Sequence, residues 1–571
     1  MTTAEKSQVL VLISDFNLAN LGSILAKNPD PPLLIPRLAP FGQVMQALLN
    51  QIPELWSEKA TGALVWTSPD WVSVSYKRLL QNQGTADDQI LREVDQFCAA
   101  IKQIPEHVKY VLVPTWTGAP WEGRLGLLDM DPTRGASLAL MRMNLRLVES
   151  LRADPRIFVL DAGRWTGAYG EQSFNRRLWY MSKTPYSAEL FKRAADDIKA
   201  AARGLLGGSR KLAIVDLDDT LWGGIVGEIG WEKVRLGGSE PIGEAFKDFQ
   251  LALKSLARRG ILLAIASKND EATALEAIRR NREMVLSLDD FAAWRINWQD
   301  KAQNIVALAA DLNLGLQSVV FIDDNPAERG RVRETLPEVL VPDWPGNPVD
   351  YKSTLLGLRC FDHPQITSED RQRSEMYASE RKRKELRQTV SSVDRWLETL
   401  NLQVEVERLN KGDLERASQL LNKTNQMNLS TRRLTVAELW DWSQQPGHVL
   451  LTFRVCDKFG DYGLVGMASL AAGSEAPGAA RMVDFILSCR VMGRRIEETM
   501  LHSLTCTARS MGAQLLYATY IPTSKNRPCL AFFDHSGFQK LNNDDTFSWV
   551  LDKVYAKPEP VGLISEAGSL S

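Results

Sequence analysis

Two aspartates, Asp216 and Asp218, directly follow an apolar, β-branched run at residues 212–215. Such a run is typical of a buried strand, and side chains two positions apart in a strand face the same side. At the carboxyl end of a strand in an open α/β sheet, that side can face the ligand crevice. Two carboxylates there can hold Mg²⁺ with phosphate oxygens, and an aspartate can itself attack phosphorus. The pattern favours phosphoryl chemistry over its plainer alternative, a solvated acidic loop.

Further polar residues follow in a fixed order along the chain. A second apolar run at 261–266 ends in Ser267, Lys301 opens a helical pattern, and a third run, SVVFIDDN, ends in Asp323 and Asp324. Taken singly, Ser267 and Lys301 are equally compatible with an ordinary cap and a solvated helix start. As an ordered set after predicted strands, these residues indicate one phosphate-handling site.

This order of Asp, Ser, Lys and an Asp pair resembles the four motifs of the haloacid dehalogenase (HAD) superfamily. The segments DLDDTLWGGIVGE, SKNDEA, WQDKAQNI and FIDDNPAERGRVRE are similar to the FkbH-like proteins of polyketide assembly lines. That resemblance extends over nearly the whole chain. It implies a Mg²⁺-dependent enzyme of the subfamily IIIC type.

The resemblance implies a role for each residue of the first motif. Asp216 would be the nucleophile or metal-facing carboxylate. Asp218 would be the general acid/base, with a pKa raised toward working pH, and a further metal ligand. Thr220 would position the loop that carries both aspartates.

The remaining motifs are implied to complete the site. Ser267 would donate a hydrogen bond to the phosphoryl group, and Lys301 would neutralise the charge that develops on it. Asp323 would bind Mg²⁺, with Asp324 as a ligand or as support for one.

The spacing of these motifs limits what can cover the site. The stretches from Asp216 to Ser267 and from Ser267 to Lys301 leave no room for a separate cap, since independent domains usually exceed about 50 residues. We therefore expect a Rossmann-like HAD domain at 206–360 without a large cap. Such a site suits a substrate presented on a protein, or one enclosed by a neighbouring domain.

Residues 1–205 alternate between apolar strand patterns and helical patterns, which predicts a parallel sheet with helices on both faces. The order resembles an SGNH-hydrolase-like domain, with Ser14, and Asp15 after it, in the place of the nucleophile. Further polar candidates for such a site are Asn17, Asn144 and Asp161.

A serine hydrolase needs a base beside its nucleophile. The first 205 residues contain a single histidine, His107, which precedes a predicted strand. The late segment SFNRRLWYMSKTPYS, where this fold usually supplies Asp and His, has no histidine. We therefore interpret Ser14 as a turn or cap residue, and expect this domain to bind or dock a partner.

The rest of the chain predicts three segments. Residues 361–400 are charge-rich and indicate a solvated helical linker. Residues 401–557 predict strands with Gly and Asp turns and a long helix, and resemble a GNAT-like α+β acyltransferase domain. Residues 558–571, rich in Gly, Ser and Pro, indicate a disordered tail. The predicted class is therefore an α/β multidomain protein.

One loop of the GNAT-like domain could bind an anion. Arg490, Gly493, Arg494 and Arg495 lie between a predicted strand and a helix, in an arrangement that resembles a GNAT pyrophosphate loop. Helix N-termini favour anions, and arginines add charge-assisted contacts, so the resemblance implies phosphopantetheine binding. The usual pattern has a small residue in the place of Arg495, and the arginines could instead begin a surface helix.

Composition excludes other broad classes. A net charge of −2 over 571 residues offers no bulk attraction to nucleic acid or to an anionic membrane, and no apolar run approaches the roughly 18 residues of a membrane span. The sequence has six cysteines and no C-x-x-C pair, which indicates a reducing compartment. We expect a cytoplasmic protein without a signal peptide.

The FkbH-like resemblance implies a complete activity. Such proteins dephosphorylate 1,3-bisphosphoglycerate and deliver the glyceryl group to the phosphopantetheine thiol of an acyl carrier protein. Two alternatives are a small-metabolite phosphatase without acyl transfer and a non-catalytic docking protein. The intact acidic motifs argue against the docking protein.

One position departs from the family. Many FkbH-like proteins carry a cysteine before the motif-two serine, whereas this chain has Ala266 there, and Leu217 stands at another position where the family can have cysteine. Ala266 is thus either the position of a lost covalent nucleophile or part of a protein that passes its acyl group directly to the carrier thiol. Its apolar neighbours also permit a plain packing role.

Overall fold

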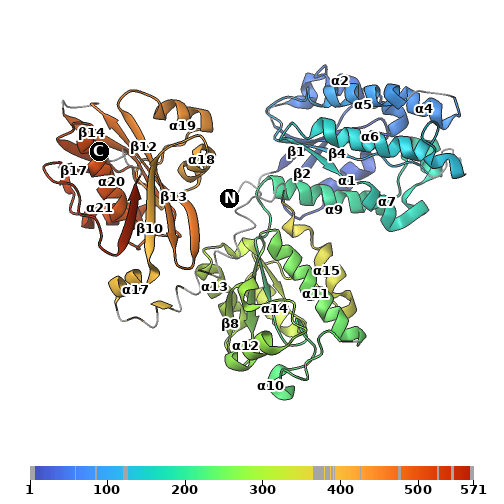
Figure 1. The fold of residues 1–571 in the computed structure, drawn as a ribbon. Helices are drawn as coiled ribbons and strands as arrows, with labels where there is room; N and C mark the ends of the chain where they lie inside the picture. Colours follow the sequence, from blue (N-terminus) through green and yellow to red (C-terminus); the bar gives the residue numbers. More distant parts are fainter. Residues whose placement is uncertain are drawn as a thin grey trace. The chain divides into compact units, whose positions relative to one another are not determined.

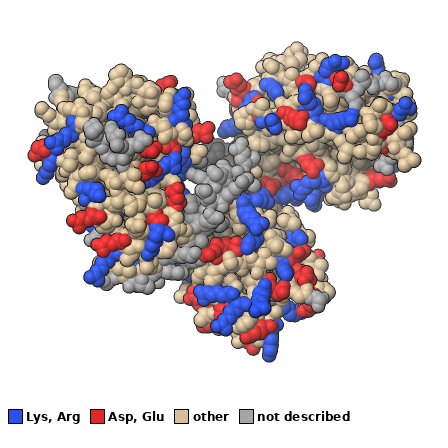
Figure 2. All heavy atoms as spheres, viewed as in Figure 1, with Lys and Arg blue, Asp and Glu red and all other residues tan. Residues whose placement is uncertain are grey.

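The computed structural model divides into two compact units, Met1–Ser374 and Glu375–Ser571. Figure 1 shows the first unit in blue to yellow and the second in orange to red. On the face drawn in Figure 2, basic and acidic side chains are interspersed. The structure describes residues 7–57, 59–83, 87–119, 126–238, 240–363, 379, 383, 386–387, 390, 392–424, 426–473, 478–523, 526–541 and 545–565.

The first unit begins with a five-stranded parallel sheet. Its order is β2 (Leu34–Leu38), β1 (Gln8–Ile13), β3 (Ala60–Val65), β4 (Tyr110–Pro114) and β5 (Ile157–Leu160). The apolar segments VLVLIS, ALVWTS, YVLVPTW and IFVLDAG predict β1, β3, β4 and β5, whereas β2 was not predicted. That strand lies at an edge and contains Pro36, which lacks a ladder donor and is tolerated only at such positions.

Helices cover both faces of this sheet, as predicted. Val11 and Ile13 point into one apolar core, and Leu10 and Leu12 into another on the opposite face, following the strand period of two. The helices of this part are α1 (Ala19–Lys27), α2 (Val44–Leu48), α3 (Pro69–Val72), α4 (Val74–Leu80), α5 (Asp87–Ile101), α6 (Ala136–Leu151), α7 (Gly163–Tyr169), α8 (Arg176–Ser182) and α9 (Ala188–Leu205).

The same unit contains a second parallel sheet. Its order is β8 (Phe291–Ile296), β7 (Leu262–Ser267), β6 (Leu212–Val215) and β9 (Val319–Ile322). Sequence analysis named no strand where β8 lies, an edge strand whose residues 293–295 are partly exposed. Its helices are α10 (Val226–Ile229), α11 (Pro241–Arg258), α12 (Glu271–Arg280), α13 (Lys301–Asp311), α14 (Pro326–Thr335) and α15 (Tyr351–Gly357).

The second sheet carries no cap domain among the residues that the structure describes. Between β6 and α11 the described chain forms the short helix α10 and turns, and between β7 and α13 it forms α12 and β8. The division at residue 205 stays a prediction, because both sheets fall within one compact unit. The predicted α/β multidomain class is confirmed.

The second unit is built on a nine-stranded mixed sheet. Its order is β16 (Gln539–Leu541), β17 (Thr546–Val550), β15 (Leu515–Thr519), β14 (Ala479–Leu487), β13 (Gly460–Ala472), β12 (His448–Asp457), β10 (Leu402–Arg408) and β18 (Val561–Ser565), with β11 (Met427–Asn428) beside β14. Its helices include α17 (Val393–Leu400), α18 (Leu414–Lys423), α19 (Val436–Ser443), α20 (Ile496–Ser510) and α21 (Arg527–His535). The parallel strands β14 and β15 are connected through α20.

The end of the predicted linker is part of this unit. In α17, Trp396, Leu397 and Leu400 are buried in the main apolar core of the second unit. The prediction of a solvated connector up to residue 400 is therefore wrong for α17, because the surrounding charges masked an amphipathic pattern whose apolar side meets the sheet. Most of residues 364–391 lie outside the described part of the chain.

The tail prediction is also wrong up to residue 565. Strand β18 pairs in parallel with β10, from Leu402 opposite Val561 to Val406 opposite Ser565, and Val561 is buried. The short apolar segment VGLIS forms a strand despite the surrounding Gly, Ser and Pro, because β10 offers it an unpaired edge. Residues 566–571 lie outside the described residues.

Deleting residues 558–571 should destabilise the protein, because it removes a paired strand and uncovers the edge of β10. Loss of the buried Val561 side chain and of the ladder predicts a free energy of unfolding lower by about 2–3 kcal/mol. Urea denaturation of the full chain and the truncated chain measures this difference. Deletion of 566–571 alone is the control and should change little; equal effects from both deletions would contradict a stabilising role for β18.

Candidate active site

The predicted phosphate-handling residues converge at one edge of the second sheet. Strand β6 lies between β7 and β9, with Val215 opposite Ile265 in one neighbour and Ile322 in the other. Asp216 follows the end of β6, Asp323 follows the end of β9, and Ser267 is the last residue of β7. The carboxyl ends of three adjacent parallel strands thus place these side chains together, as expected for a ligand crevice.

Three carboxylates form a cluster that can hold a metal ion. One oxygen from each of Asp216, Asp323 and Asp324 lies within 4.8 Å of the others. Asp216 and Asp323 are buried, at 6% and 0% exposed, and Asp216 Oδ1 has no hydrogen-bond partner among the described residues. A buried, unpartnered carboxylate oxygen is costly. An all-oxygen carboxylate set suits Mg²⁺ or another hard cation, so these residues fit a Mg²⁺ ion.

Lys301 supplies the opposing charge within the cluster. It begins α13, whose N-terminus is capped by Asp300. Its Nζ lies 3.0 Å from Asp216 Oδ2 and 2.6 Å from Asp323 Oδ2. Burial alone would lower the pKa of Lys301, but the two carboxylates outweigh it and raise that pKa to about 12. Lys301 is therefore held as a cation between the two carboxylates, and its predicted role toward a phosphoryl group stays a prediction.

The pKa values of the acids around Lys301 show that burying several negative charges close together is unfavourable. Burial raises the pKa of Asp323, and the negative charge of Asp216 raises it further against the opposing effect of Lys301. Burial likewise raises the pKa of Asp324, with added contributions from Asp216 and Asp219. A cation bound beside these carboxylates would stabilise their charged forms and would lower both pKa values.

Thr220 joins the two loops that carry the acids. Its buried hydroxyl donates to Asp324 Oδ1 at 3.2 Å and accepts from the Asp324 N–H at 3.1 Å. Arg329, on α14, donates to the main-chain oxygens of Asp323 and Asp324 at 2.8 and 2.6 Å. The positioning role predicted for Thr220 fits this placement. Arg329 was not among the candidates, since a basic residue in the first turn of a helix carries no distinctive motif.

Asp218 lies outside the metal-competent cluster of the described residues. Its Oδ1 accepts from Trp222 Nε1 at 2.9 Å and from the Val226 N–H at 3.0 Å, and its Oδ2 accepts from Asn269 Nδ2 at 2.8 Å. Both Asp218 carboxylate oxygens thus have hydrogen-bond partners in the chain, and the metal ligation predicted for Asp218 is not among the contacts that the described residues show. Asp216 and Asp218 are close in sequence, but the turn after β6 separates their surroundings.

The surroundings of Asp218 suit the predicted general acid/base. Burial raises its pKa, and the hydrogen bonds from Val226 and Trp222 oppose that shift. A raised pKa keeps a carboxyl group able to donate a proton nearer neutrality. Asn269, two residues after Ser267, holds the other carboxylate oxygen and was missed, although the motif SKND contains it.

Ser267 and Ala266 are both buried at the end of β7. Ser267 lies two residues after Ile265, so the strand period places both on the same face, and Ala266 points the other way. Ala266 stands opposite Arg295 in the register with β8 and is 0% exposed. The structure thus gives Ala266 a packed environment, and whether it replaces a nucleophile stays a prediction.

The polar candidates of the first sheet do not form one site. Ser14 and Asn17 line a cavity of about 310 Å³, whereas Asp161 lines a different cavity. Asn144 is engaged by the main chain of Trp116, accepting from its N–H at 2.8 Å and donating to its oxygen at 2.9 Å.

Asp15 is the residue with the most altered electrostatics near Ser14. Burial raises its pKa to about 6, against hydrogen bonds from the Ser68 side chain and N–H. His107 is exposed at the start of β4. The Ser14 hydroxyl accepts from the Phe16 N–H at 3.1 Å, and the interpretation of Ser14 as a turn or cap residue stays a prediction.

The predicted arginine loop does lie between a strand, β14, and a helix, α20. Arg494 is only 6% exposed, donates to the Tyr462 hydroxyl and lies over the Tyr462 and Trp396 rings. Arg495 adopts a left-handed conformation at φ 64° and pairs with Glu498 at 3.2 Å, and Arg490 bonds Ser488. The buried contacts of Arg494 make it a packing residue rather than a surface contact for phosphate.

Glu497 occupies part of the anion-binding environment at this helix start. Its Oε1 accepts from the Gly493 N–H at 2.7 Å, and its other oxygen is buried without a partner among the described residues. Burial raises the pKa of Glu497 to about 7, against the hydrogen bond from Gly493. An acidic group of the chain itself therefore takes up the N–H that was expected to face a ligand phosphate. Phosphopantetheine binding by the loop stays a prediction.

Comparison with known proteins gives one structural neighbour that bears on the site. The N-terminal part of protein BF1531 from Bacteroides fragilis, whose crystal structure contains a phosphatase domain complexed with Mg, is 28% identical, covers 63% of this chain and 95% of its own, and has a TM-score of 0.54. Spermidine N-acetyltransferase from Vibrio cholerae, in complex with CoA and spermine, is 16% identical over 26% of this chain and 97% of its own, with a TM-score of 0.21. Such a low score has no bearing on function.

Searches against family models and curated proteins returned no match. No helix in the described part of the chain combines the length and hydropathy needed to cross a lipid bilayer.

Replacing Glu497 with Gln should alter the pH dependence of stability. Because the folded pKa of about 7 lies above the ordinary glutamate value of 4.5, the stabilising contribution of the protonated group is fully present below 4.5 and is lost as pH rises through 7. The Gln variant stays neutral and keeps an acceptor for Gly493. As pH rises from 5 to 8.5, the free energy of unfolding of the Gln variant should increase relative to that of the parent by about 1–3 kcal/mol. Thermal unfolding of both full-length proteins across this range measures the difference.

The matched control for that measurement is Glu498→Gln, which removes the neighbouring, partly exposed carboxylate. Its difference from the parent protein should vary little with pH. A constant difference between Glu497→Gln and the parent across the range would show that Glu497 is ionised in the fold throughout.

Proposed function

We propose that this protein is a Mg²⁺-dependent HAD-type enzyme with phosphatase and acyl-transfer activity. The observation that carries the proposal is the buried cluster of Asp216, Asp323 and Asp324 around Lys301, at the carboxyl ends of adjacent parallel strands. The neighbouring BF1531 structure, with its phosphatase domain complexed with Mg, supports this chemistry.

The geometry supports a two-step displacement at phosphorus. The Asp216 carboxylate attacks the phosphoryl group, forming an aspartyl-phosphate as the bond from phosphorus to the leaving oxygen breaks. Asp218 gives its proton to that oxygen, and then takes a proton from the water that attacks the aspartyl-phosphate. This second step releases phosphate and restores the Asp216 carboxylate.

The remaining residues hold and neutralise the phosphoryl group. The Ser267 hydroxyl donates to a phosphoryl oxygen, and Lys301 offsets charge that develops there. Mg²⁺, when bound by the Asp216, Asp323 and Asp324 carboxylates, supplies positive charge for phosphate binding. Thr220 and Arg329 keep the acids in place through the loop contacts described above.

The finer proposal follows the FkbH-like resemblance. The substrate would be 1,3-bisphosphoglycerate. The phosphopantetheine thiol of an acyl carrier protein would attack its C1 carbonyl, and the thioester would form as the bond to the acyl phosphate breaks and that phosphate leaves with the thiol proton. The displacement at phosphorus described above would remove the 3-phosphate. An acyl phosphate is an activated acyl donor, and a site without a cap domain among the described residues suits an acceptor presented on a protein. The motifs FIDDNPAERGRVRE and WQDKAQNI are the features that favour this substrate class.

A small-metabolite phosphatase without acyl transfer is the second candidate. Two observations favour it. The position before Ser267 carries Ala266 in place of cysteine, and the Arg494 guanidinium is buried against Tyr462 and Trp396. Release of phosphate without any carrier-bound product would distinguish this candidate from the acyl transferase.

Asp216→Asn should abolish both phosphate release and acyl transfer, because it keeps the shape of the side chain but removes the negative charge that attacks phosphorus and would help to hold Mg²⁺ at the bound phosphate. Activity should fall at least about a thousandfold. Phosphate assays and intact-mass analysis of carrier proteins, with Mg²⁺ and candidate acyl phosphates, measure the two activities. The control Asp350→Asn makes the same chemical change at an exposed position of the same sheet domain. Near-normal turnover by Asp216→Asn would refute the mechanism.

The unmodified chain should form no stable glyceryl thioester on itself, because Ala266 replaces the family's cysteine. Ala266→Cys should form one and, if Ala266 marks a lost nucleophile, should also raise transfer to the carrier. Mass spectrometry before and after hydroxylamine treatment detects the adduct, with Ala266→Ser as the control. A hydroxylamine-sensitive adduct on a cysteine of the unmodified chain would show the prediction to be wrong.

A further inference from the structure

Trp298 lies two residues beyond the end of β8, close to the proposed catalytic site. The residue is 76% exposed and is the one exposed tryptophan among the residues that the structure describes. Tryptophan side chains are on average highly buried, and aromatic rings at the surface are enriched where proteins contact a ligand or a partner. An exposed indole at this place therefore indicates a contact with a ligand.

The turn that carries Trp298 is held on both sides. The Asn297 N–H donates to the Ser267 main-chain oxygen at 3.1 Å, which continues the pairing of β7 and β8 by one residue. Asp300 caps α13 and accepts from Arg331 Nε at 3.1 Å. The turn is therefore positioned before any ligand binds, which lowers the entropy cost of a contact made by the indole.

The alternation of side chains along β8 places Trp298 on the α12 side of the sheet. Trp294 Nε1 donates to Glu271 Oε1, on α12, at 2.8 Å. Asn297 points to the opposite face, where its side chain accepts from Asn304 Nδ2, on α13, at 2.9 Å. Residues an even number of positions apart in a strand share a face, so Trp298 follows Trp294 rather than Asn297.

The general acid of the proposed mechanism is held at the neighbouring strand end. Ser267 stands opposite Ile296 in the register of β7 with β8, so these two side chains share the face of Trp298. Two residues beyond Ser267, Asn269 Nδ2 donates to Asp218 Oδ2 at 2.8 Å. Asn269 thus holds the Asp218 carboxyl group at the carboxyl end of β7, the strand beside the Trp298 turn.

A second exposed apolar side chain lies near Asp218 in the turn after β6. Ile225, 46% exposed, precedes Val226, whose N–H donates to Asp218 Oδ1 at 3.0 Å. Trp298 belongs to the turn after β8, and β7 lies between β6 and β8 in the sheet. The end of β7 beside Asp218 is thus flanked by Ile225 on one side and Trp298 on the other.

We propose that Ile225 and Trp298 form an apolar contact for the carbon chain of the leaving group in the phosphoryl reaction. This inference rests on the proposed function, in which Asp218 protonates the leaving oxygen. The chain attached to that oxygen begins beside Asp218, between the two exposed side chains. The site would therefore select phosphate compounds with an extended chain, such as one of methylene and amide groups, over compact polyol phosphates.

The size of this preference follows from the apolar surface that the chain would cover. A methylene group transferred fully from water to an apolar contact gives about a fourfold gain in affinity. Contacts at an open rim bury each group only in part, so a chain of six carbons should gain at least about fivefold over one of two carbons. A rigid aromatic ring supplies such contact area at little cost in side-chain entropy.

Calorimetric titration of the full chain with Mg²⁺ tests the proposal, with ethylphosphonate and hexylphosphonate as separate probes. Both probes carry the same anionic head group, and neither has an ester bond that the enzyme could hydrolyse. Hexylphosphonate should bind at least about fivefold more tightly than ethylphosphonate. Inorganic phosphate should displace both, because the head group occupies the proposed phosphoryl site.

Variants assign the preference to the two side chains. Trp298→Ala removes the ring and should bind the two phosphonates within about twofold of each other. Ile225→Ala should lower the ratio of the two affinities, and Trp298→Phe should keep part of it because a smaller ring still covers the chain. Leu251→Ala, at a 48% exposed position on α11, is the matched control and should keep the ratio of the parent.

Failure of this inference and failure of the proposed function give different results. Equal binding of the two phosphonates by the parent, or an unchanged ratio in Trp298→Ala, would overturn the inference and leave the phosphoryl site in place. Hexylphosphonate that inorganic phosphate fails to displace would also overturn it, because the chain would then bind elsewhere. If neither phosphonate binds at about 10 mM, roughly the weakest useful affinity, the proposed phosphoryl site is refuted and this inference with it.

Discussion

The buried ion pairs of Lys301 with Asp216 and Asp323 are the interaction on which the catalytic end of the second sheet depends. Removing charges from water is costly, and the cost is offset only where an opposite charge lies within contact distance. Lys301 Nζ pairs with one oxygen of each acid, at 3.0 and 2.6 Å. Because the three groups come from β6, α13 and β9, their pairing fixes the relative positions of the elements that would bind a phosphoryl group.

Around this centre, polar contacts hold loops that the apolar core cannot reach. Thr220 and Arg329 link the turn after β6 to the turn after β9 through Asp324. Asn269 and the main chain of Val226 hold Asp218 in a different environment from Asp216. Two carboxylates only two positions apart thereby acquire different surroundings, which is the condition for dividing nucleophilic and acid–base roles between them.

In the second unit, charged side chains at the start of helix α20 are also partnered within the chain. At the start of α20, Glu497 accepts from the Gly493 N–H, and Arg494 is buried against Tyr462 and Trp396. The helix N-terminus thus has an acidic partner from its own first turn, which is favourable with the helix dipole. In this loop the chain's own acidic and aromatic side chains thus occupy the places where an external anion was expected.

The sequence by itself predicted those elements whose formation depends on a local pattern of apolar residues. Apolar runs ending in Asp216, Ser267 and Asp323 predicted the strands, and their order predicted a shared site, because parallel strands bring their carboxyl ends to one edge. The edge strands β2, β8 and β18 were not predicted. β2 contains a proline, β8 is partly exposed and β18 is a short segment, and the pairing of each depends on a neighbouring strand.

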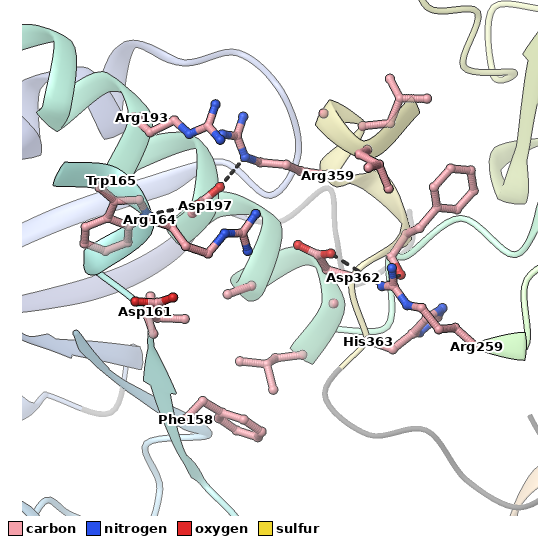
Figure 3. A pocket seen from close by; sticks show the side chains of 18 of the residues that line it. Phe158, Asp161, Arg164, Trp165, Arg193, Asp197, Arg259, Arg359, Asp362 and His363 are labelled. Carbon is pink, nitrogen blue, oxygen red and sulfur yellow. Dashed lines mark hydrogen bonds and ion pairs between the residues drawn. The ribbon is translucent and has the colours of Figure 1, made fainter. Parts of the chain in front are cut away.

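Only the tertiary structure decided how side chains distant in sequence share their partners. Residue spacing suggested that Asp218 would join Asp216 at the metal, but the turn after β6 directs it to Asn269 and α10. The cavity that Asp161, Arg193 and Arg359 line (Figure 3) has no sequence signature, because its lining comes from segments beside both sheets of the first unit. Motifs record chemistry along the chain, whereas burial, charge compensation and unpaired donors arise only when separate elements pack together.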